Sequence, residues 1–313
     1  MRSKAVILAF CLGMAAAAFA QQPATLRLAK SALWTSEEKP FVLQSKVTEV
    51  AVQLAVTDRS GKPVTGLTRD DLQILDDGIP AAITQLRRED DLPLRIALVI
   101  DWSDSMQKEL KFERQLALDF LHTTLRPATD QAMVVGFRYR VEVTQALTRD
   151  GARLEAGLRP VSGVSLSSVY DALIAATEEL RKTDPTLPQR RAIVLLSDGQ
   201  DNVSAHGLDD VIQAAQRANV TIYTITPRTR RVRSESDKFL KGLADLTGGR
   251  SFFIPPAGEQ LAFEKIEQDL RLGYAVYFKP GMAAGDRFRS LEIMPRDRSL
   301  QVLARRSYYA GWE

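Results

Sequence analysis

Between residues 94 and 272, the sequence alternates short apolar runs with longer segments that carry apolar residues at helical spacing. The run Ile96-Ala97-Leu98-Val99-Ile100 is apolar throughout, as expected for a strand that is covered on both faces of a sheet. The segment from Met106 to Leu125 instead places its large apolar residues on one helical face. Strands that alternate with helices of this length predict an α/β fold, a mostly parallel sheet flanked by helices. The other expected strands are 133–137, 141–143, 192–196, 220–225 and 252–254, and the other expected helices are 169–180, 208–218, 239–246 and 261–272.

Both flanks of this region carry strand patterns. Val50, Val52, Leu54 and Val56 alternate with smaller or polar residues, which predicts a half-buried strand. Further strands are expected from Leu72 up to a turn at Asp76-Asp77-Gly78, and at 79–86, 274–278, 288–294 and 300–303. Two β pieces of this size are too small to fold alone, so we expect them to pack together as a β-sandwich-like module. The predicted parts are therefore an N-terminal β module (47–92), an α/β domain (93–272) and a C-terminal β segment (273–313).

The first twenty residues have the layout of a secretory signal peptide. Arg2 and Lys4 give a basic start, an apolar run follows, and Ala18-Phe19-Ala20 has the small-x-small pattern of a cleavage site. We therefore expect an exported protein, periplasmic or extracellular, in which residues 21–46 form a lead-in of mixed composition. No later stretch has the roughly 18 apolar residues of a membrane span, so none is expected in the mature chain.

Composition excludes several kinds of chemistry and partner. The single cysteine, Cys11, lies in the segment expected to be removed, which leaves no thiol for catalysis, zinc binding or disulfides. Loss of Arg2 and Lys4 reduces the 42 basic residues to 40, against 39 acidic ones, so the mature chain carries a formal charge of +1. A net charge this small lacks the excess of basic residues that is typical of nucleic-acid-binding proteins, so no nucleic-acid partner is expected.

Polar residues follow two of the apolar strands at the point where each strand ends. Asp101-Trp102-Ser103-Asp104-Ser105 comes directly after the first strand, and Ser197-Asp198-Gly199 follows the strand at 192–196. The carboxyl ends of parallel strands meet at one edge of a sheet, where the functional sites of such folds lie. Asp101, Ser103, Ser105 and Asp198 bring carboxylate and hydroxyl oxygens there, and these hard donors suit Mg²⁺, Mn²⁺ or Ca²⁺ rather than zinc or copper.

This D-x-S-x-S pattern, with a second strand that ends in Asp-Gly, resembles the metal-ion-dependent adhesion site (MIDAS) of von Willebrand factor type A (VWA) domains. That family also has a threonine before a helix that reads close to Tyr-Asp-Ala-Leu. Here the segment is Ser167-Ser168-Val169-Tyr170-Asp171-Ala172-Leu173, with Ser167 at the threonine position and Ser168 as the alternative. The segments Val64-Thr65-Gly66-Leu67 and Arg306-Ser307-Tyr308-Tyr309-Ala310 also resemble a secreted bacterial VWFA-related family known mainly from Acidobacteria. The resemblance extends from about residue 47 to the C-terminus and implies a Rossmann-like VWA fold.

The resemblance also implies how the site works. Ser103, Ser105 and Ser167 would bind a divalent cation directly, while Asp101 and Asp198 would act largely through water. Mg²⁺ is the first choice of ion, and Mn²⁺ and Ca²⁺ are the others. An open coordination position would take a carboxylate from a partner protein, so the implied function is protein binding or adhesion and not catalysis.

Two other interpretations remain open. Serines before a helix often only cap it, in which case the chain is a structural or scaffold protein with a degenerate metal site. An aspartate at the end of the first strand also suits a phosphatase of the haloacid-dehalogenase type. That reaction, however, needs a second aspartate as general acid where Ser103 stands. The motifs G-x-S-x-G, H-E-x-x-H and G-x-x-x-x-G-K are missing from the sequence, which disfavours other enzyme classes.

Residues beside the motif suggest a partner-binding face. Trp102 is either an exposed anchor at an interface or packs under the metal loop. His206 is expected to be a surface loop residue close to Asp198. A basic segment after the strand at 220–225 either favours an acidic partner at the metal edge or is a solvated loop. Its basic residues are Arg228, Arg230, Arg231 and Arg233.

Overall fold

The computed structural model describes residues 49–106, 110–184, 186–227, 234–254, 259–281 and 287–310. The expected signal peptide (1–20) and lead-in (21–46) lie outside these residues. None of the described helices combines the length and apolar character that crossing a membrane requires.

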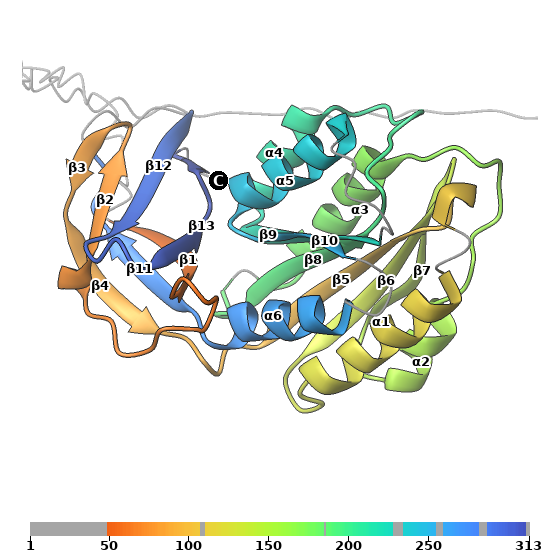
Figure 1. Cartoon of the computed structure of the whole chain (residues 1–313), viewed down its shortest axis with the longest axis horizontal. Coiled ribbons are helices and arrows are strands. Elements are labelled where there is room, and N and C mark those ends of the chain that lie inside the picture. Colours follow the sequence, from red (N-terminus) through yellow and green to blue (C-terminus); the bar gives the residue numbers. More distant parts are fainter. Residues whose placement is uncertain are drawn as a thin grey trace, which may run out of the picture. The chain divides into compact units, whose positions relative to one another are not determined.

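A six-stranded sheet with the strand order β10-β9-β8-β5-β6-β7 forms the α/β part of the chain (Figure 1). All neighbouring strands are parallel except β7, which runs antiparallel to β6 at one edge. The apolar run of β5 is buried along almost its whole length, as the sequence predicts for a central strand. The strands are β5 (Leu94–Asp101), β6 (Gln131–Phe137), β7 (Val141–Thr148), β8 (Arg190–Leu196), β9 (Val220–Pro227) and β10 (Ser251–Ile254).

Helices cover both faces of this sheet, and each face has its own hydrophobic core (Figure 1). Residues of α1 (Leu110–Thr124), α2 (Gly151–Gly157) and α6 (Glu259–Arg271) pack on one face. Residues of α3 (Val169–Arg181), α4 (Leu208–Arg217) and α5 (Glu235–Thr247) pack on the other face. A mostly parallel sheet between two layers of helices is the fold class that the sequence predicts, and that prediction is confirmed.

Four local features differ from the sequence-based expectation. The single strand expected at 79–86 is divided into β3 (Ile79–Ala81) and β4 (Ile83–Arg88), which belong to different sheets. The helix expected to start at Met106 is a 3-10 turn, η2 (Asp104–Met106), followed by α1 from Leu110. The expected short strand 141–143 extends to Thr148, because an edge strand can leave polar residues exposed and so lacks a clear apolar pattern. Helix α2 was not expected, since it is a short helix whose first turn is capped by the side chain of Asp150.

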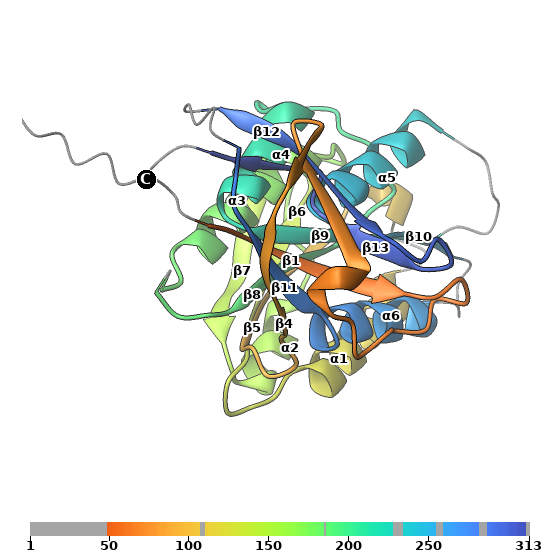
Figure 2. The same ribbon diagram turned by 90° about the vertical axis from the view of Figure 1, so that its left-hand side faces the viewer.

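Strands from both flanks of the chain form two four-stranded sheets, here called the β module (Figure 2). One sheet has the order β13-β1-β11-β4 and the other β14-β12-β2-β3. Strand β1 pairs with β11 and β13, and β2 pairs with β12, so neither flank forms its sheet alone. The strands are β1 (Val50–Thr57), β2 (Leu72–Asp76), β3 (Ile79–Ala81), β4 (Ile83–Arg88), β11 (Tyr274–Phe278), β12 (Phe288–Pro295), β13 (Gln301–Ala304) and β14 (Ser307–Tyr309), with the 3-10 turn η1 (Arg69–Asp71) before β2.

A shared apolar core lies between the two sheets of the β module. Val52, Val56, Ile74, Val276 and Leu291 are all at most 1% exposed and belong to one cluster that draws on both sheets and both flanks. This arrangement agrees with the expected sandwich of two β pieces that are each too small to fold alone.

Candidate metal site

The candidate metal site lies at the carboxyl edge of the parallel sheet, where β5 and β8 end side by side (Figure 1). Asp101 is the last residue of β5, and Ser197 follows the last residue of β8. Ile100 is paired with Leu196, so the two loops leave the sheet at the same level. Strand β6 lies on the opposite side of β5, and β8 is reached later in the chain, so the strand order reverses here. Ligands of open α/β sheets bind at such a reversal.

The carboxylate of Asp101 is buried and accepts hydrogen bonds from neutral groups. Oδ1 accepts from the Ser103 N–H at 2.9 Å, and Oδ2 accepts from the hydroxyls of Ser197 at 2.8 Å and Ser167 at 3.3 Å. Asp101 is 0% exposed, and burial raises the pKa of its carboxyl. Hydrogen bonds from Ser103 and Ser197 oppose this rise, and the nearby Asp198 adds to it.

The chemistry of these donors fits a divalent cation. Within the part of the chain that the structure describes, no basic side chain forms an ion pair with Asp101. A buried carboxylate is costly unless it is paired or neutralised, and a cation bound by hydroxyl oxygens supplies that charge. No group of three or more His, Cys, Asp and Glu side chains forms a metal site among the described residues. The oxygen donors at this edge are mainly serine hydroxyls, so this site is not of the kind built from His, Cys, Asp and Glu side chains.

The two candidate hydroxyls on the loop before α3 face different partners. The Ser167 hydroxyl donates to Asp101, and the side chain is 2% exposed. The Ser168 hydroxyl donates to the carbonyl of Arg138 at 2.7 Å and is thereby committed to the β6–β7 turn. Ser103 is also buried, at 6% exposure, while the side chain of Ser105 lies outside the described part of the structure. The geometry thus brings Ser103 and Ser167, but not Ser168, to Asp101.

Asp198 lies on the adjacent loop and is held there by its own neighbour. Its Oδ1 accepts from the Gln200 N–H at 3.0 Å, and its Oδ2 accepts from the Gln200 side-chain amide at 3.1 Å. Asp198 is half-buried and close enough to raise the pKa of Asp101. A carboxylate that is kept near the site without a direct bond to Asp101 is suited to act through water.

Two residues without an assigned role in the sequence analysis also shape the site. The Ser197 hydroxyl accepts from the Gly199 N–H at 2.9 Å while it donates to Asp101, so it fixes both the loop and the carboxylate. Asn202 accepts from the Ser167 N–H at 3.2 Å through its side chain, and its own N–H donates to the Ser167 carbonyl at 2.8 Å. The only sequence signal for Ser197 was its position directly after an apolar strand.

The interpretation of Trp102 as an exposed anchor is wrong. Its side chain is 5% exposed and belongs to the core on the α1 face, and its backbone N–H donates to the Phe137 carbonyl at 2.9 Å. A Cβ atom at Gly136 would lie 2.9 Å from the indole nitrogen, so the neighbouring strand leaves room only for glycine there. The alternative holds, because Trp102 packs below the loop that carries the serines.

The remaining predictions concern four arginines of the proposed partner-binding face and His206, which was expected to be a surface loop residue. Arg228, Arg230, Arg231 and Arg233 lie outside the described residues. His206 is exposed in its loop, and its Nδ1 lies 2.7 Å from Oδ1 of Asp171.

Exposed apolar side chains lie on the loop that carries Ser167 and on the neighbouring β6–β7 turn. Tyr139, in the β6–β7 turn, is 49% exposed, and Val164 and Leu166 are 60% and 38% exposed. The loops are joined to the site, because Ser165 accepts from the Asp104 N–H at 2.9 Å and Arg138 forms an ion pair with the Asp104 carboxylate.

Residues 96–200 match the family model of the von Willebrand factor type A domain. This match runs from within β5 to just beyond β8 and includes every described residue of the candidate site except Asn202. The chain therefore contains a von Willebrand factor type A domain. No curated protein matches the chain at a significant level.

Three solved structures illustrate the likeness in fold. The conserved protein BatB from Bacteroides thetaiotaomicron is 15% identical, with a TM-score of 0.46, over 56% of this chain and 98% of that one. The SpRpn10 VWA domain is 18% identical, with a TM-score of 0.41, over 56% and 94%. Proximal thread matrix protein 1 from the mussel byssus, solved with a zinc-occupied MIDAS motif, is 18% identical, with a TM-score of 0.49, over 61% and 49%. With identities below 25% and TM-scores below 0.5, these likenesses do not indicate which residues act in this chain.

Proposed function

We propose that this protein is an exported, non-enzymatic binding protein that captures a carboxylate of a partner protein at a divalent metal site. The observation that carries the proposal is the buried Asp101 carboxylate, which is surrounded by hydroxyls and forms no ion pair with a described residue. Export rests on the basic start, apolar run and Ala18-Phe19-Ala20 of the N-terminus.

The proposed site residues hold the ion in two ways, as direct ligands or through water. Ser103, Ser105 and Ser167 are the proposed direct ligands, and Asp101 and Asp198 orient water and supply negative charge. Mg²⁺ is the first choice for this oxygen set, followed by Mn²⁺ and Ca²⁺. Since the direct ligands are neutral, the bound ion keeps most of its positive charge, which it offers to an incoming carboxylate.

The loops around the site give the partner further contacts. Tyr139 in the β6–β7 turn, and Val164 and Leu166 on the loop that carries Ser167, are exposed apolar side chains. A metal-bound carboxylate at the centre with an apolar rim around it suits a protein partner, because apolar anchors supply affinity while the charged contact supplies specificity.

The first test measures ion binding. We expect Mg²⁺ or Mn²⁺ to raise the melting temperature of the protein and, with Trp34 and Trp312 replaced by Phe, to change the fluorescence of Trp102, which packs below the metal loop. Asp101→Ala and Ser167→Ala should lose both responses. Ser168→Ala is the matched control, because its hydroxyl is bonded to Arg138 and not to Asp101. Equal ion affinity in wild type and Asp101→Ala would contradict the site, and no response with any ion would favour the scaffold interpretation.

The second test measures carboxylate capture on the metal-loaded protein. We expect a capped Gly-Asp-Gly peptide to bind in the presence of Mg²⁺ and a capped Gly-Asn-Gly peptide not to bind, as measured by chemical shifts in NMR titrations. The Val164→Ser variant should bind Mg²⁺ normally but bind an apolar-flanked Asp peptide more weakly. Leu187→Ser is the matched control, because Leu187 is 57% exposed and lies on the loop before β8, at the opposite edge of the sheet.

A further inference from the structure

Arg138, in the β6–β7 turn, joins the two loops that carry the proposed metal ligands. Its backbone carbonyl accepts from the Ser168 N–H at 3.0 Å, on the loop that carries Ser167. Its guanidinium forms an ion pair with the carboxylate of Asp104, which stands between two of the proposed serine ligands in the sequence. The ion pair is therefore located at the metal edge of the sheet.

Asp104 places a carboxylate at the surface beside the site. Its side chain is 58% exposed, whereas that of Arg138 is 16% exposed. Together with Asp101 and Asp198, it gives the site three carboxylates, one negative charge more than a divalent cation neutralises. This excess charge would repel the carboxylate of a partner, and the guanidinium of Arg138 balances it.

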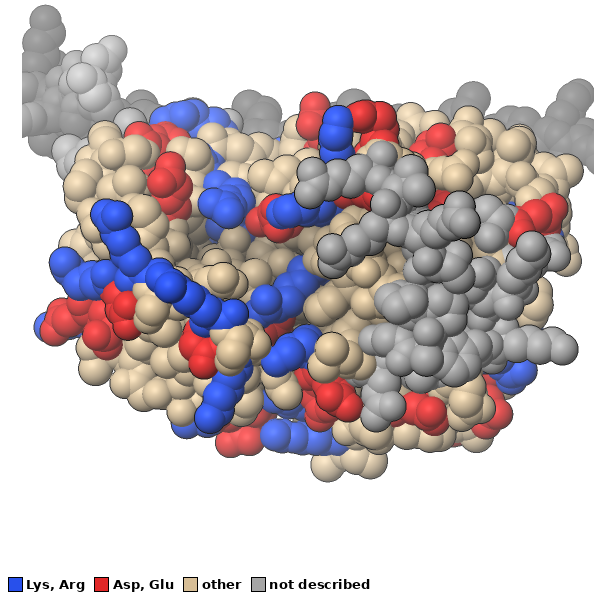
Figure 3. All heavy atoms as spheres, viewed as in Figure 1, with Lys and Arg blue, Asp and Glu red and all other residues tan. Residues whose placement is uncertain are grey.

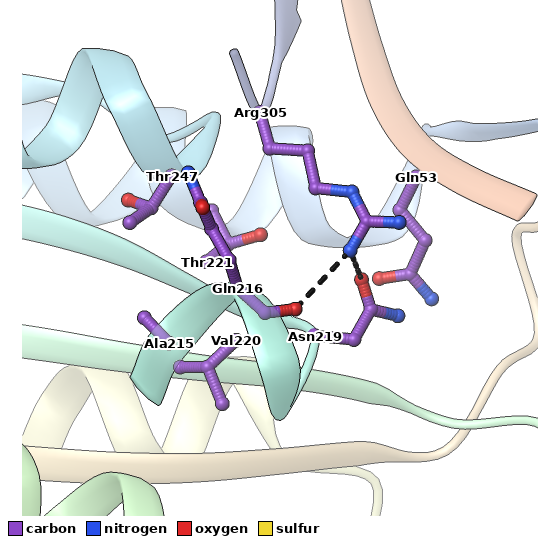
Figure 4. A pocket seen from close by; sticks show the side chains of 8 residues that line it. All are labelled: Gln53, Ala215, Gln216, Asn219, Val220, Thr221, Thr247 and Arg305. Carbon is purple, nitrogen blue, oxygen red and sulfur yellow. Dashed lines mark hydrogen bonds between the residues drawn. The ribbon is translucent and has the colours of Figure 1, made fainter. Parts of the chain in front are cut away.

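Arg305 also joins two parts of the chain, but through neutral groups. It reaches from the β module to the end of α4, where Nη1 donates to the Gln216 carbonyl at 3.4 Å and to Oδ1 of Asn219 at 3.2 Å (Figure 4). The pocket beside these contacts has room for about one water molecule. Arg305 therefore stabilises a junction of the fold, and it serves as a structural comparison for Arg138.

We propose that Arg138 makes the metal site selective for a carboxylate partner by neutralising Asp104, a role that rests on the proposed function. With the ion pair intact, the surface beside the bound ion presents no unbalanced negative charge to an incoming Asp or Glu side chain. Without Arg138, Asp104 attracts the cation more strongly and repels the partner. The affinities for the ion and for the partner then change in opposite directions, which a loss of support for the loops would not produce.

Arg138→Gln tests this role through two separate affinities. Titration calorimetry measures Mg²⁺ binding to the peptide-free protein, and NMR titration at saturating Mg²⁺ measures binding of the capped Gly-Asp-Gly peptide. At low ionic strength, we expect the variant to bind Mg²⁺ about 5-fold more tightly and the peptide about 5-fold more weakly than wild type does. High salt should reduce both differences, because the charges lie near the surface.

Binding of the peptide elsewhere on the molecule has to be separated from capture at the metal site. On the face shown in Figure 3, Lys and Arg side chains are frequent over the β module and around its border with the α/β part. An acidic peptide can bind to such a surface without the ion. Only the part of the peptide signal that EDTA abolishes is therefore counted.

Two further variants complete a double-mutant cycle. Asp104→Asn leaves the charge of Arg138 unbalanced, so it should bind Mg²⁺ more weakly and the peptide more tightly than wild type does. Arg138→Gln combined with Asp104→Asn should return both affinities to within about twofold of wild type. Arg305→Gln is the structural control, because it removes hydrogen bonds to the end of α4, and it should lower the melting temperature without changing either affinity.

Unchanged affinities or equal losses of both affinities in Arg138→Gln would overturn the proposal, and so would a double variant that does not recover. Arg138 would then only support the loops. A wild-type protein that binds no peptide at saturating Mg²⁺ would refute carboxylate capture itself, and this role of Arg138 with it, before any variant is measured.

Discussion

Ser197 holds one oxygen of the Asp101 carboxylate and the backbone of the next loop at the same time. Its hydroxyl donates to Oδ2 of Asp101 at 2.8 Å and accepts from the Gly199 N–H at 2.9 Å. Groups that orient metal-site residues contribute about 10- to 100-fold to metal affinity. We therefore expect Ser197→Ala to weaken Mg²⁺ binding by about that factor, as measured by titration calorimetry.

Ser60→Ala is the control for removal of a serine hydroxyl. Ser60 is exposed in a turn of the β module, where its hydroxyl bonds to Asp58. It should leave the affinity for Mg²⁺ unchanged. If Ser197→Ala also binds Mg²⁺ as tightly as wild type, then Asp101 is positioned by other contacts and the role given to Ser197 is wrong.

The same residues explain which parts of the site the sequence could predict. Asp101 and Ser167 were predicted because the motif carries both, and the structure brings them together. Ser197 received no role, because its contact with Asp101 depends on β8 lying next to β5, and strand order is not encoded in a local pattern. The position of the Trp102 side chain could not be predicted from the sequence. Trp102 stands between Asp101 and Ser103 in a tight turn, and such a turn can direct a side chain either to the surface or into the core.

At the scale of elements, Gly248 ends α5 where residues 304–305 of the β module pass close to it. Its φ is +86°, and an added Cβ would lie 2.7 Å from the backbone nitrogen of Arg305 and 2.8 Å from the carbonyl carbon of Ala304. Gly248→Ala should therefore combine backbone strain of about 1–2 kcal/mol with an overpacking cost of about 1–3 kcal/mol. Urea unfolding of the variant measures the sum.

Gly66→Ala separates these two contributions. Gly66 has a φ of +93°, but no atom lies within 4 Å of an added Cβ. This variant should show the strain alone, about 1–2 kcal/mol. Equal losses in the two variants would mean that the close approach of residues 304–305 to α5 adds nothing to stability.

Asp130 joins three elements and should make stability depend on pH. It accepts from the Leu94 N–H at 2.8 Å and the Arg126 N–H at 2.7 Å, and it pairs with Arg271 of α6. Burial raises the pKa of Asp130, but these bonds outweigh it and hold the pKa below its ordinary value. The unfolded chain then binds the proton more tightly. The stabilising contribution is therefore full above the unfolded value of about 3.9 and is lost as pH falls through the lower folded pKa.

Asp130→Asn removes this contribution, so the free energies of unfolding of wild type and variant should converge below about pH 4 and differ most near neutral pH. Chemical denaturation at a series of pH values measures both. Asp119→Asn, at an exposed position of α1, controls for the removal of one negative charge. A difference between wild type and Asp130→Asn that is independent of pH would contradict this assignment.

Most elements were predictable because their apolar residues repeat with the period of a strand or a helix. Strand β5 and helix α3 follow their predicted ranges closely, since each buries a continuous face. Helix α2 and the outer half of β7 bury too little to leave a pattern, so their positions depend on contacts with the rest of the sheet. The sequence predicts elements that build the core and misses those that only border it.

At the scale of the whole described molecule, the β module and the α/β part should unfold together. The chain passes from one to the other both before β5 and after α6. The Arg306 N–H donates to the Leu246 carbonyl at 3.0 Å at the end of α5, and Arg217 of α4 lies against Tyr309 of β14. Contacts at both helix ends couple the two parts, so damage to one should lower the stability of the other.

Asp76→Asn tests this coupling from inside the β module. Asp76 accepts from Arg289 at 2.7 and 2.9 Å and from the Tyr308 hydroxyl at 3.1 Å, and both members of the ion pair are at most 2% exposed. Loss of one partner of a buried pair costs about 3–5 kcal/mol.

With Trp34 and Trp312 replaced by Phe, fluorescence reports Trp102 in the α/β core alone. We expect this signal and circular dichroism to shift together to lower denaturant. Asp77→Asn, whose pair with Arg287 is partly exposed, should shift neither by more than about 1 kcal/mol. If the circular-dichroism transition of Asp76→Asn moves to lower denaturant while the Trp102 fluorescence transition stays in place, then the two parts fold independently.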